Sequence, residues 1–170
     1  MENRKKILAD GLLRAIKAER DGHSFYQMAA TCSEDSKAKE VFARLAGEEL
    51  DHMYFLMKQH EAILNTGRPD ESAELGPRAN LSGMSPIFSE GIRARIKNAH
   101  FEMSALSIGI QLELDAMRFY RAQAEATDDA AVQEFYRELA DWESGHYEAL
   151  SRQQNELKED YWSASGFSPM

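Results

Sequence analysis

Two short stretches, Glu49-Leu50-Asp51-His52 and Glu143-Ser144-Gly145-His146, carry residue types that bind metal ions. Both have the form Glu-x-x-His. On a helix, residues three positions apart lie on the same face, one turn from each other. A carboxylate and an imidazole presented in this way can bind one metal ion together. Two copies in one chain therefore predict two metal ions, or one site with two centres.

The similarity between the two halves of the chain extends beyond these motifs. When residues 16–59 are aligned with residues 110–153, 14 of 44 positions are identical. The identical pairs with chemically active side chains include Glu19/Glu113, Tyr26/Tyr120, Glu49/Glu143 and His52/His146. Two repeats are too few for a solenoid, which needs about three. The sequence instead predicts a duplicated helical hairpin.

The elements that must position these residues are long helices. Apolar residues recur at the helical period and predict helices at residues 4–31, 36–64, 98–126 and 129–158. Cap-forming polar residues separate the helices within each pair. The only long connection, at residues 65–85, is rich in Gly and Pro and precedes a short helix at 86–97. This pattern predicts an all-α four-helix bundle with one long crossover between the second and third long helices.

The alternative fold is a simple up-down-up-down bundle, which would not need a connection of this length. A chain of 170 residues is long enough for one domain with a core. We expect the bundle to occupy residues 1–160. We expect the aromatic tail at residues 161–170 to be irregular and to pack back on the bundle.

The spacing within each half brings the carboxylates to the same level. Glu19 and Glu49 are 30 residues apart, and so are Glu113 and Glu143, with a predicted turn midway between the members of each pair. At ~1.5 Å per residue each glutamate lies roughly 22 Å from its turn, so antiparallel helices place the two side by side. If the hairpins pack about a pseudo-two-fold axis, four carboxylates and two imidazoles meet in the core.

Composition excludes several other classes of function. The formal net charge of −9 argues against a nucleic-acid partner, which would require a basic face. No apolar run approaches the ~20 residues of a membrane span, and the first residues do not resemble a signal peptide. We therefore expect a cytoplasmic protein. With a single cysteine, the chain has neither an internal disulfide nor a Cys-x-x-Cys metal site.

Leaving four carboxylates in the core without cations would be costly, because buried charges cost several kcal/mol each unless paired or bound to metal. Two divalent ions would neutralise them. Oxygen ligands with one imidazole per ion and open positions suit iron or manganese better than a closed zinc site. Manganese or zinc can nevertheless substitute for iron at such a site.

On these residues the chain resembles the ferritin-like di-iron superfamily and, within it, rubrerythrin-like proteins, whose ligand set this is. The resemblance covers the four helices and implies a centre of two iron ions. It implies metal ligands at Glu19, Glu49, His52, Glu113, Glu143 and His146. By analogy Glu49 and Glu143 bridge the two ions, and the other four are terminal ligands. Which terminal glutamate shares an ion with which histidine stays open at this stage.

The chain also departs from that family. Rubrerythrins proper carry a C-terminal rubredoxin domain, whose cysteine ligands this sequence, with its single cysteine, does not have. They carry a further glutamate about one turn from the lone glutamate of the third helix, where this chain has Ile110 and Ala116 on either side of Glu113. Ferritins usually add a short fifth helix for cage assembly, and the aromatic tail does not resemble one.

The resemblance implies a non-haem di-iron oxidoreductase of the oxidative-stress response, which reduces hydrogen peroxide or dioxygen with electrons from an external donor. We expect a homodimer. One alternative is a ferroxidase or iron-handling protein without its own reductant, and another is a bundle with a structural metal.

Four further residues lie near the motifs in the sequence. Tyr26 and Tyr120 lie seven residues after their lone glutamates, on the same helix face, and serve either core packing or a hydrogen bond to a ligating carboxylate. Glu48 and Trp142 precede the two motifs at equivalent positions. Because these two differ in type, we expect neither to belong to the duplicated site.

Overall fold

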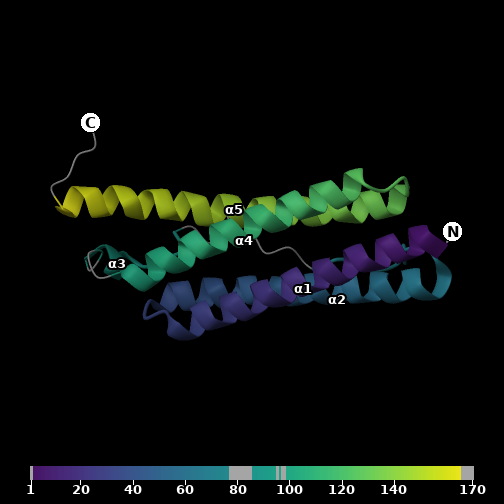
Figure 1. Cartoon of the computed structure of the whole chain (residues 1–170). Helices are drawn as coiled ribbons and strands as arrows, with labels where there is room; N and C mark the ends of the chain where they lie inside the picture. Colours follow the sequence, from purple (N-terminus) through teal and green to yellow (C-terminus); the bar gives the residue numbers. More distant parts are fainter. Residues whose placement is uncertain (1, 77–85, 95, 97–98, 166–170) are drawn as a thin grey trace.

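The computed structural model describes residues 2–76, 86–94, 96 and 99–165. Its helices, in chain order, are α1 (Glu2–Cys32), α2 (Ser36–Thr66), α3 (Glu90–Ala94), α4 (His100–Glu125) and α5 (Ala130–Ser165) (Figure 1). The described part of the chain contains no strand, and the predicted all-α class is confirmed.

The helices form two antiparallel hairpins that lie side by side (Figure 1). Helix α1 packs along α2, α4 packs along α5, and the hairpins meet chiefly where α1 faces α4. Because α2 and α4 run in the same direction, the connection between them has to return along the length of the bundle (Figure 1). This is the predicted ferritin-like bundle with a long crossover.

Each hairpin turn is closed by the same kind of cap. The Asp35 carboxylate accepts hydrogen bonds from the backbone N–H groups of Lys37 and Ala38, at 3.1 and 3.0 Å, at the start of α2. Its counterpart Asp129 accepts from Ala131 and Val132, at 3.2 and 3.3 Å, at the start of α5. Such caps satisfy amide groups that the first helical turn leaves without partners. The duplicated aspartates thereby fix both turns.

A second duplicated pair anchors the crossover. Gln59 on α2 exchanges two hydrogen bonds of 2.9 Å with the backbone of Asp70. Gln153 on α5 accepts hydrogen bonds from the backbone N–H groups of Ile87 and Phe88. Both glutamine side chains are buried. The first described stretch of the crossover is thus held to one hairpin and the later stretch to the other.

The apolar core consists of two clusters of buried side chains. One contains Tyr26, Phe42, Leu45 and the α3 residue Ile92. The other contains the residues that the repeat pairs with the first three of these, namely Tyr120, Tyr136 and Leu139. The repeat thus distributes equivalent residues to separate clusters, and the charged residues of the Glu-x-x-His motifs belong to neither cluster.

Helix α5 is longer than predicted. It continues to Ser165 instead of ending at residue 158, so the expectation of an irregular tail from residue 161 is wrong for the first five residues of that tail. The sequence has no Gly or Pro between Leu157 and Ser165 that would end a helix. Tyr161 and Trp162 are 42% and 38% exposed, so their side chains are only partly covered. The remaining tail residues, 166–170, lie outside the described residues.

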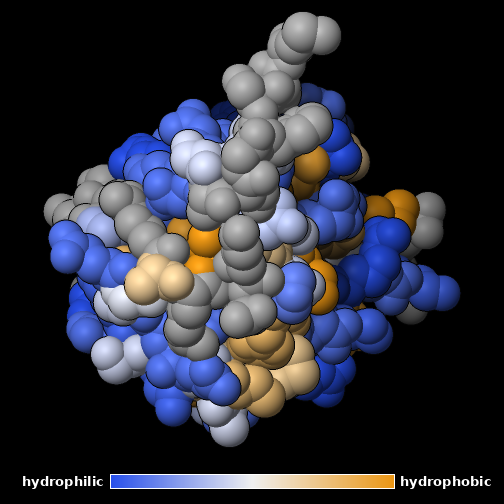
Figure 2. Space-filling model, turned by 90° about the vertical axis from the view of Figure 1, so that its left-hand side faces the viewer, coloured by the Kyte–Doolittle hydropathy of each residue, from blue (hydrophilic) through white to orange (hydrophobic). Residues whose placement is uncertain are grey.

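Hydrophilic side chains cover most of the end of the bundle where α3 and the last turns of α5 lie, and hydrophobic ones show near its centre (Figure 2). In the described part of the chain, no helix combines the length and apolar character that crossing a membrane requires.

Candidate metal centre

The structure brings all six predicted residues together in the middle of the bundle. They form two overlapping groups, Glu19, Glu49, His52 and Glu143, and Glu49, Glu113, Glu143 and His146. Within each group, one potential ligand atom from every residue lies within 4.8 Å of the others. None of the six residues is more than 4% exposed. Glutamates from all four long helices therefore converge with two imidazoles in a space shielded from water.

Glu49 and Glu143 belong to both groups, as expected for residues that bridge two ions. The structure also pairs the terminal residues, which the sequence left open. Glu19 lies with His52, whose Nδ1 is 3.4 Å from a Glu19 oxygen. Glu113 lies with His146, whose Nδ1 is 3.6 Å from a Glu113 oxygen. Each group thus combines the lone glutamate of one hairpin with the histidine of the Glu-x-x-His motif in the same hairpin.

Glu143 holds the central place between the two imidazoles. One of its oxygens lies 3.1 Å from His52 Nδ1 and the other 3.2 Å from His146 Nδ1. The two imidazole rings are nearly parallel, with centroids 6.0 Å apart. Both Nδ1 atoms therefore face the carboxylates.

Many atoms in this space have no hydrogen-bond partner among the residues that the structure describes. They are Glu19 Oε2, Glu49 Oε1, both carboxylate oxygens of Glu143, both ring nitrogens of His52, and His146 Nδ1. Buried polar atoms are rarely left without a partner in a native protein, and an ion is one of the standard explanations when they are. The donor set of oxygens with one imidazole per group suits iron or manganese. The two buried clusters are consistent with a di-metal site, whereas the identity of the ion and the ligand role of each residue stay predictions.

The two duplicated tyrosines connect the hairpins. The Tyr26 hydroxyl of α1 donates a hydrogen bond to Glu113 of α4, and the Tyr120 hydroxyl of α4 donates one to Glu19 of α1. Each tyrosine thus orients the terminal glutamate of the opposite hairpin. Burial, together with the Glu113 carboxylate, raises the pKa of Tyr26, so its hydroxyl stays a hydrogen-bond donor. Of the two roles that the sequence left open, the geometry supports the hydrogen bond to a candidate ligand.

The expectation that Glu48 and Trp142 lie outside the site is wrong. Glu48 is buried, and one of its oxygens lies 3.0 Å from Nε2 of His146. Trp142 is buried, and its ring forms a T-shaped contact with His52 at a centroid distance of 4.9 Å. Both residues precede a motif in sequence and contact the imidazole of the opposite hairpin. Identity between repeats misses such positions, but the shared location one residue before each motif is a signal that could have found them.

The charges of the site are strongly coupled. Burial raises the pKa values of Glu19 and Glu113 well above the usual carboxyl value, and nearby carboxylates add to the shift. Burial alone would lower the pKa values of His52 and His146, but neighbouring carboxylates outweigh it and raise both. For Glu143 burial is outweighed by the two imidazoles, which lower its pKa well below the usual value. In the metal-free protein, protons thus take the place of cations.

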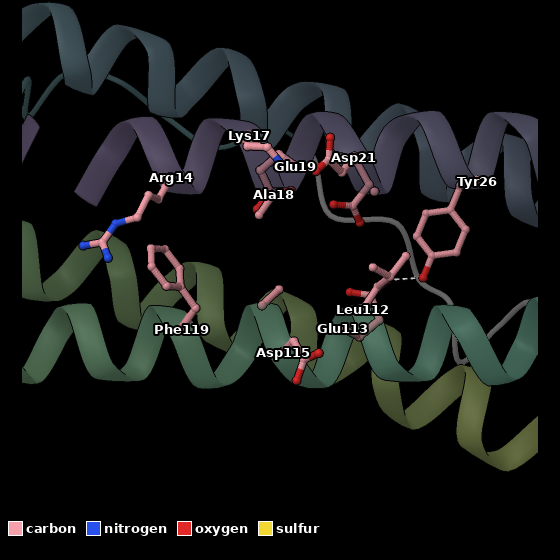
Figure 3. Close-up of a pocket in the computed structure, with 13 residues that line it drawn as sticks. Arg14, Lys17, Ala18, Glu19, Asp21, Tyr26, Leu112, Glu113, Asp115 and Phe119 are labelled. Carbon is pink, nitrogen blue, oxygen red and sulfur yellow. Dashed lines mark hydrogen bonds and ion pairs between the residues drawn. The ribbon is translucent and has the colours of Figure 1, made fainter. Parts of the chain in front are cut away.

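A pocket of about 470 Å³ opens onto the site between α1 and α4 (Figure 3). Its lining contains the candidate ligands Glu19, Glu49 and Glu113 together with other charged residues of α1 and α4. Gly22 lies in the wall, where a Cβ atom would lie only 3.2 Å from a Glu49 oxygen. A small molecule or an ion can therefore reach the carboxylates from this side.

A comparison with protein families agrees with this geometry. The Rubrerythrin family model matches residues 10–151, a span that contains all six candidate ligands and both tyrosines. No curated protein and no solved structure matches the chain. Because the family model covers most of the sequence, and the fold and the buried carboxylate–histidine clusters fit it, the chain belongs to the rubrerythrin family.

Proposed function

We propose that this protein is a non-haem di-iron oxidoreductase that reduces hydrogen peroxide. The observation that carries the proposal is the pair of buried clusters sharing Glu49 and Glu143, with a pocket leading to them. When bound there, two ferrous ions would supply one electron each to break the O–O bond, with two protons completing two water molecules. An external electron donor would then return the ions to the ferrous state.

The side chains have distinct tasks in this proposal. Glu19 and His52 would hold one ion, Glu113 and His146 the other, and the two shared glutamates both. The tyrosine hydroxyls keep the terminal glutamates in one orientation. The burial of all six ligands excludes bulk water, while the pocket between α1 and α4 admits a substrate as small as peroxide or dioxygen.

The test is peroxide reduction by the iron-loaded protein. The protein is reduced without oxygen, peroxide is added, and the visible spectrum and peroxide consumption are followed. Glu49→Gln should lose turnover. Glu40→Gln, the same change at an exposed position of α2, is the matched control and should behave as wild type. An unchanged spectrum with no turnover above that of Glu49→Gln would contradict the proposal.

An alternative is iron handling, in which ferrous iron itself is the substrate and is oxidised for storage or delivery. The carboxylates of Glu19, Glu49 and Glu113 in the lining of the pocket favour this alternative, since an incoming ferrous ion could bind them. The two functions differ in the demand for a reductant. Repeated peroxide turnover with catalytic iron and an added reductant supports the oxidoreductase. Oxidation of many ferrous ions per chain, retained by a large assembly, supports iron handling.

We also propose a homodimer. Leu13 on α1 and Tyr54, Met57 and Leu64 on α2 are 46–52% exposed and line one broad groove. Exposed apolar surface of this kind often marks a contact with another protein. Light scattering after gel filtration measures the mass directly, and a Tyr54→Glu variant should shift a dimer toward monomer. A wild-type monomer would contradict this part of the proposal.

A further inference from the structure

The two halves of the candidate metal centre differ in one contact. Glu48 and Trp142 occupy equivalent positions in the repeat, and each reaches the imidazole of the opposite hairpin. Glu48 places a carboxylate oxygen 3.0 Å from Nε2 of His146. The ring of Trp142 forms a T-shaped contact with His52, with an interplanar angle of 78°. The imidazole of His146 therefore contacts a carboxylate, whereas the imidazole of His52 contacts an aromatic ring.

This difference affects which ring nitrogen carries a proton when the imidazoles are neutral. An ionised carboxylate only accepts hydrogen bonds, so Glu48 requires the proton of His146 on Nε2. Nδ1 of His146 is then left with its lone pair toward Glu49, Glu113 and Glu143, at 3.2–3.6 Å. His52 has no such constraint, because its Nε2 has no hydrogen-bond partner among the described residues.

A ligating imidazole that donates a hydrogen bond to a carboxylate becomes a more basic ligand, and its orientation is fixed. Glu48 also brings one more negative charge close to one cluster. Burying that charge is costly unless something compensates for it, and a cation bound by His146 would do so. Both effects act on the cluster that contains His146 and Glu113, and neither acts through the hydrogen-bonding atoms of His52.

We propose that Glu48 is a positioning residue that makes the two metal positions unequal, so that the position formed by Glu113 and His146 fills before the position formed by Glu19 and His52. The inference rests on the di-metal centre of the proposed function but does not depend on peroxide reduction. Loss of such an outer partner typically lowers metal affinity about 10- to 100-fold.

The test is a titration of the metal-free protein with Co²⁺, followed by its visible absorption. Wild type should bind two ions in separate steps. Glu48→Gln should weaken the first step about 10- to 100-fold and leave the second unchanged. The matched control Glu40→Gln, on the exposed face of the same helix, should change neither step. Two further variants assign the binding steps to the two positions. Glu113→Gln should remove the first step, and Glu19→Gln should remove the second.

Nitrogen NMR of the imidazoles provides a second readout, which reports on the ring nitrogens directly. In the zinc-loaded wild type, His146 should show a protonated Nε2 that exchanges slowly with water, and Glu48→Gln should shift this signal without affecting His52. Two equal binding steps in wild type, or equal weakening of both steps by Glu48→Gln, would overturn the inference. Unequal steps without peroxide turnover would instead contradict only the proposed function.

Discussion

The hairpin α1–α2 and the hairpin α4–α5 share the six candidate ligands and the two tyrosines that contact them. Each supplies a lone glutamate, a Glu-x-x-His motif and a tyrosine whose hydroxyl reaches the opposite hairpin. Outside that set the hairpins diverge. Glu48 corresponds to Trp142, and Gly22 to Ala116. The comparison indicates that the duplication preserved the groups facing the centre and allowed the layer behind them to change.

The divergence is confined to positions where a change does not remove a candidate ligand. Gly109, which corresponds to Ala15, is an example. A Cβ atom on Gly109 would lie 3.1 Å from the Tyr26 hydroxyl and 3.2 Å from Leu150. The glycine leaves room for the tyrosine that holds Glu113. Symmetry of the ligands and asymmetry of their surroundings can therefore be tested separately.

The largest expected effect distinguishes shared from terminal glutamates. Glu143→Gln changes a residue common to both clusters, and Glu19→Gln changes a residue of one cluster. We expect Glu143→Gln to lose both metal ions, with affinity reduced about 100-fold or more, and Glu19→Gln to retain one. Metal content after dialysis, measured by mass spectrometry, gives the stoichiometry. Retention of two ions by Glu143→Gln would mean that this residue does not bridge.

The next largest expected effect is a pH dependence of the free energy of unfolding, to which both hairpins contribute. In the metal-free protein the pKa values of Glu19 and Glu113 are raised above 4.5, and those of His52 and His146 above 6.5. The folded state then binds more protons than the unfolded state above pH 4.5, so the free energy of unfolding falls as pH rises. Each additional proton contributes about 1.4 kcal/mol per pH unit. The lowered pKa of Glu143 has the opposite effect on the free energy of unfolding, but only below pH 4.5.

We therefore expect the midpoint temperature of thermal unfolding in EDTA to decrease as the pH is raised from 5.5 to 8. With metal bound the trend should reverse, because metal binding requires deprotonated ligands. Thermal melts in matched buffers, with and without metal, measure both trends. A metal-free protein that becomes more stable toward pH 8 would show that the carboxylates are not coupled as the geometry indicates.

Much of this arrangement could be predicted from the sequence, because helical period and repeat spacing fix which residues lie level with one another. The 30-residue separation of Glu19 and Glu49 required only helix geometry and a turn between them. The role of Glu48 could not be predicted in this way. Its contact with His146 crosses between hairpins and depends on how they are rotated against each other, which neither hairpin's sequence pattern determines.

The extension of α5 shows a different limit. The helix continues past the last strongly periodic residues because no breaker intervenes before Ser165. Aromatic residues at 161 and 162 suggested burial, yet they lie on exposed turns. Aromatic character alone therefore does not indicate where a segment packs, because exposed large side chains are common on protein surfaces.

The tyrosine hydroxyls allow a further comparison of the two hairpins, with a smaller expected effect on metal affinity. Tyr26→Phe removes the hydrogen bond to Glu113, and Tyr120→Phe removes the bond to Glu19. Each should weaken binding about tenfold at the metal position of the glutamate it releases, leaving the other position unchanged. Co²⁺ titration of each variant gives both constants. If either change weakened both positions equally, the crossed hydrogen bonds would be acting on the whole bundle rather than on one ion.

The smallest effect compares the two helix caps. Asp35 caps α2 and also accepts a hydrogen bond from the Ser89 hydroxyl in the crossover, whereas Asp129 caps α5 and pairs with the exposed Arg4. We expect Asp129→Ala to cost about 1 kcal/mol and Asp35→Ala about 2 kcal/mol. An exposed ion pair such as that of Arg4 contributes little stability, so losing it should not make Asp129→Ala as destabilising as Asp35→Ala.

Urea unfolding of the metal-loaded protein measures both losses, and in a Ser89→Ala background the loss from Asp35→Ala should fall toward that from Asp129→Ala. Residues in direct contact give non-additive effects, so this double change isolates the contribution of the Ser89 hydroxyl, because the Ser89 backbone N–H still donates to Asp35. Equal losses in the wild-type background would mean that the Ser89 contact contributes no stability. The crossover would then be held mainly by Gln59 and Gln153, the pair that the duplication has kept on both hairpins.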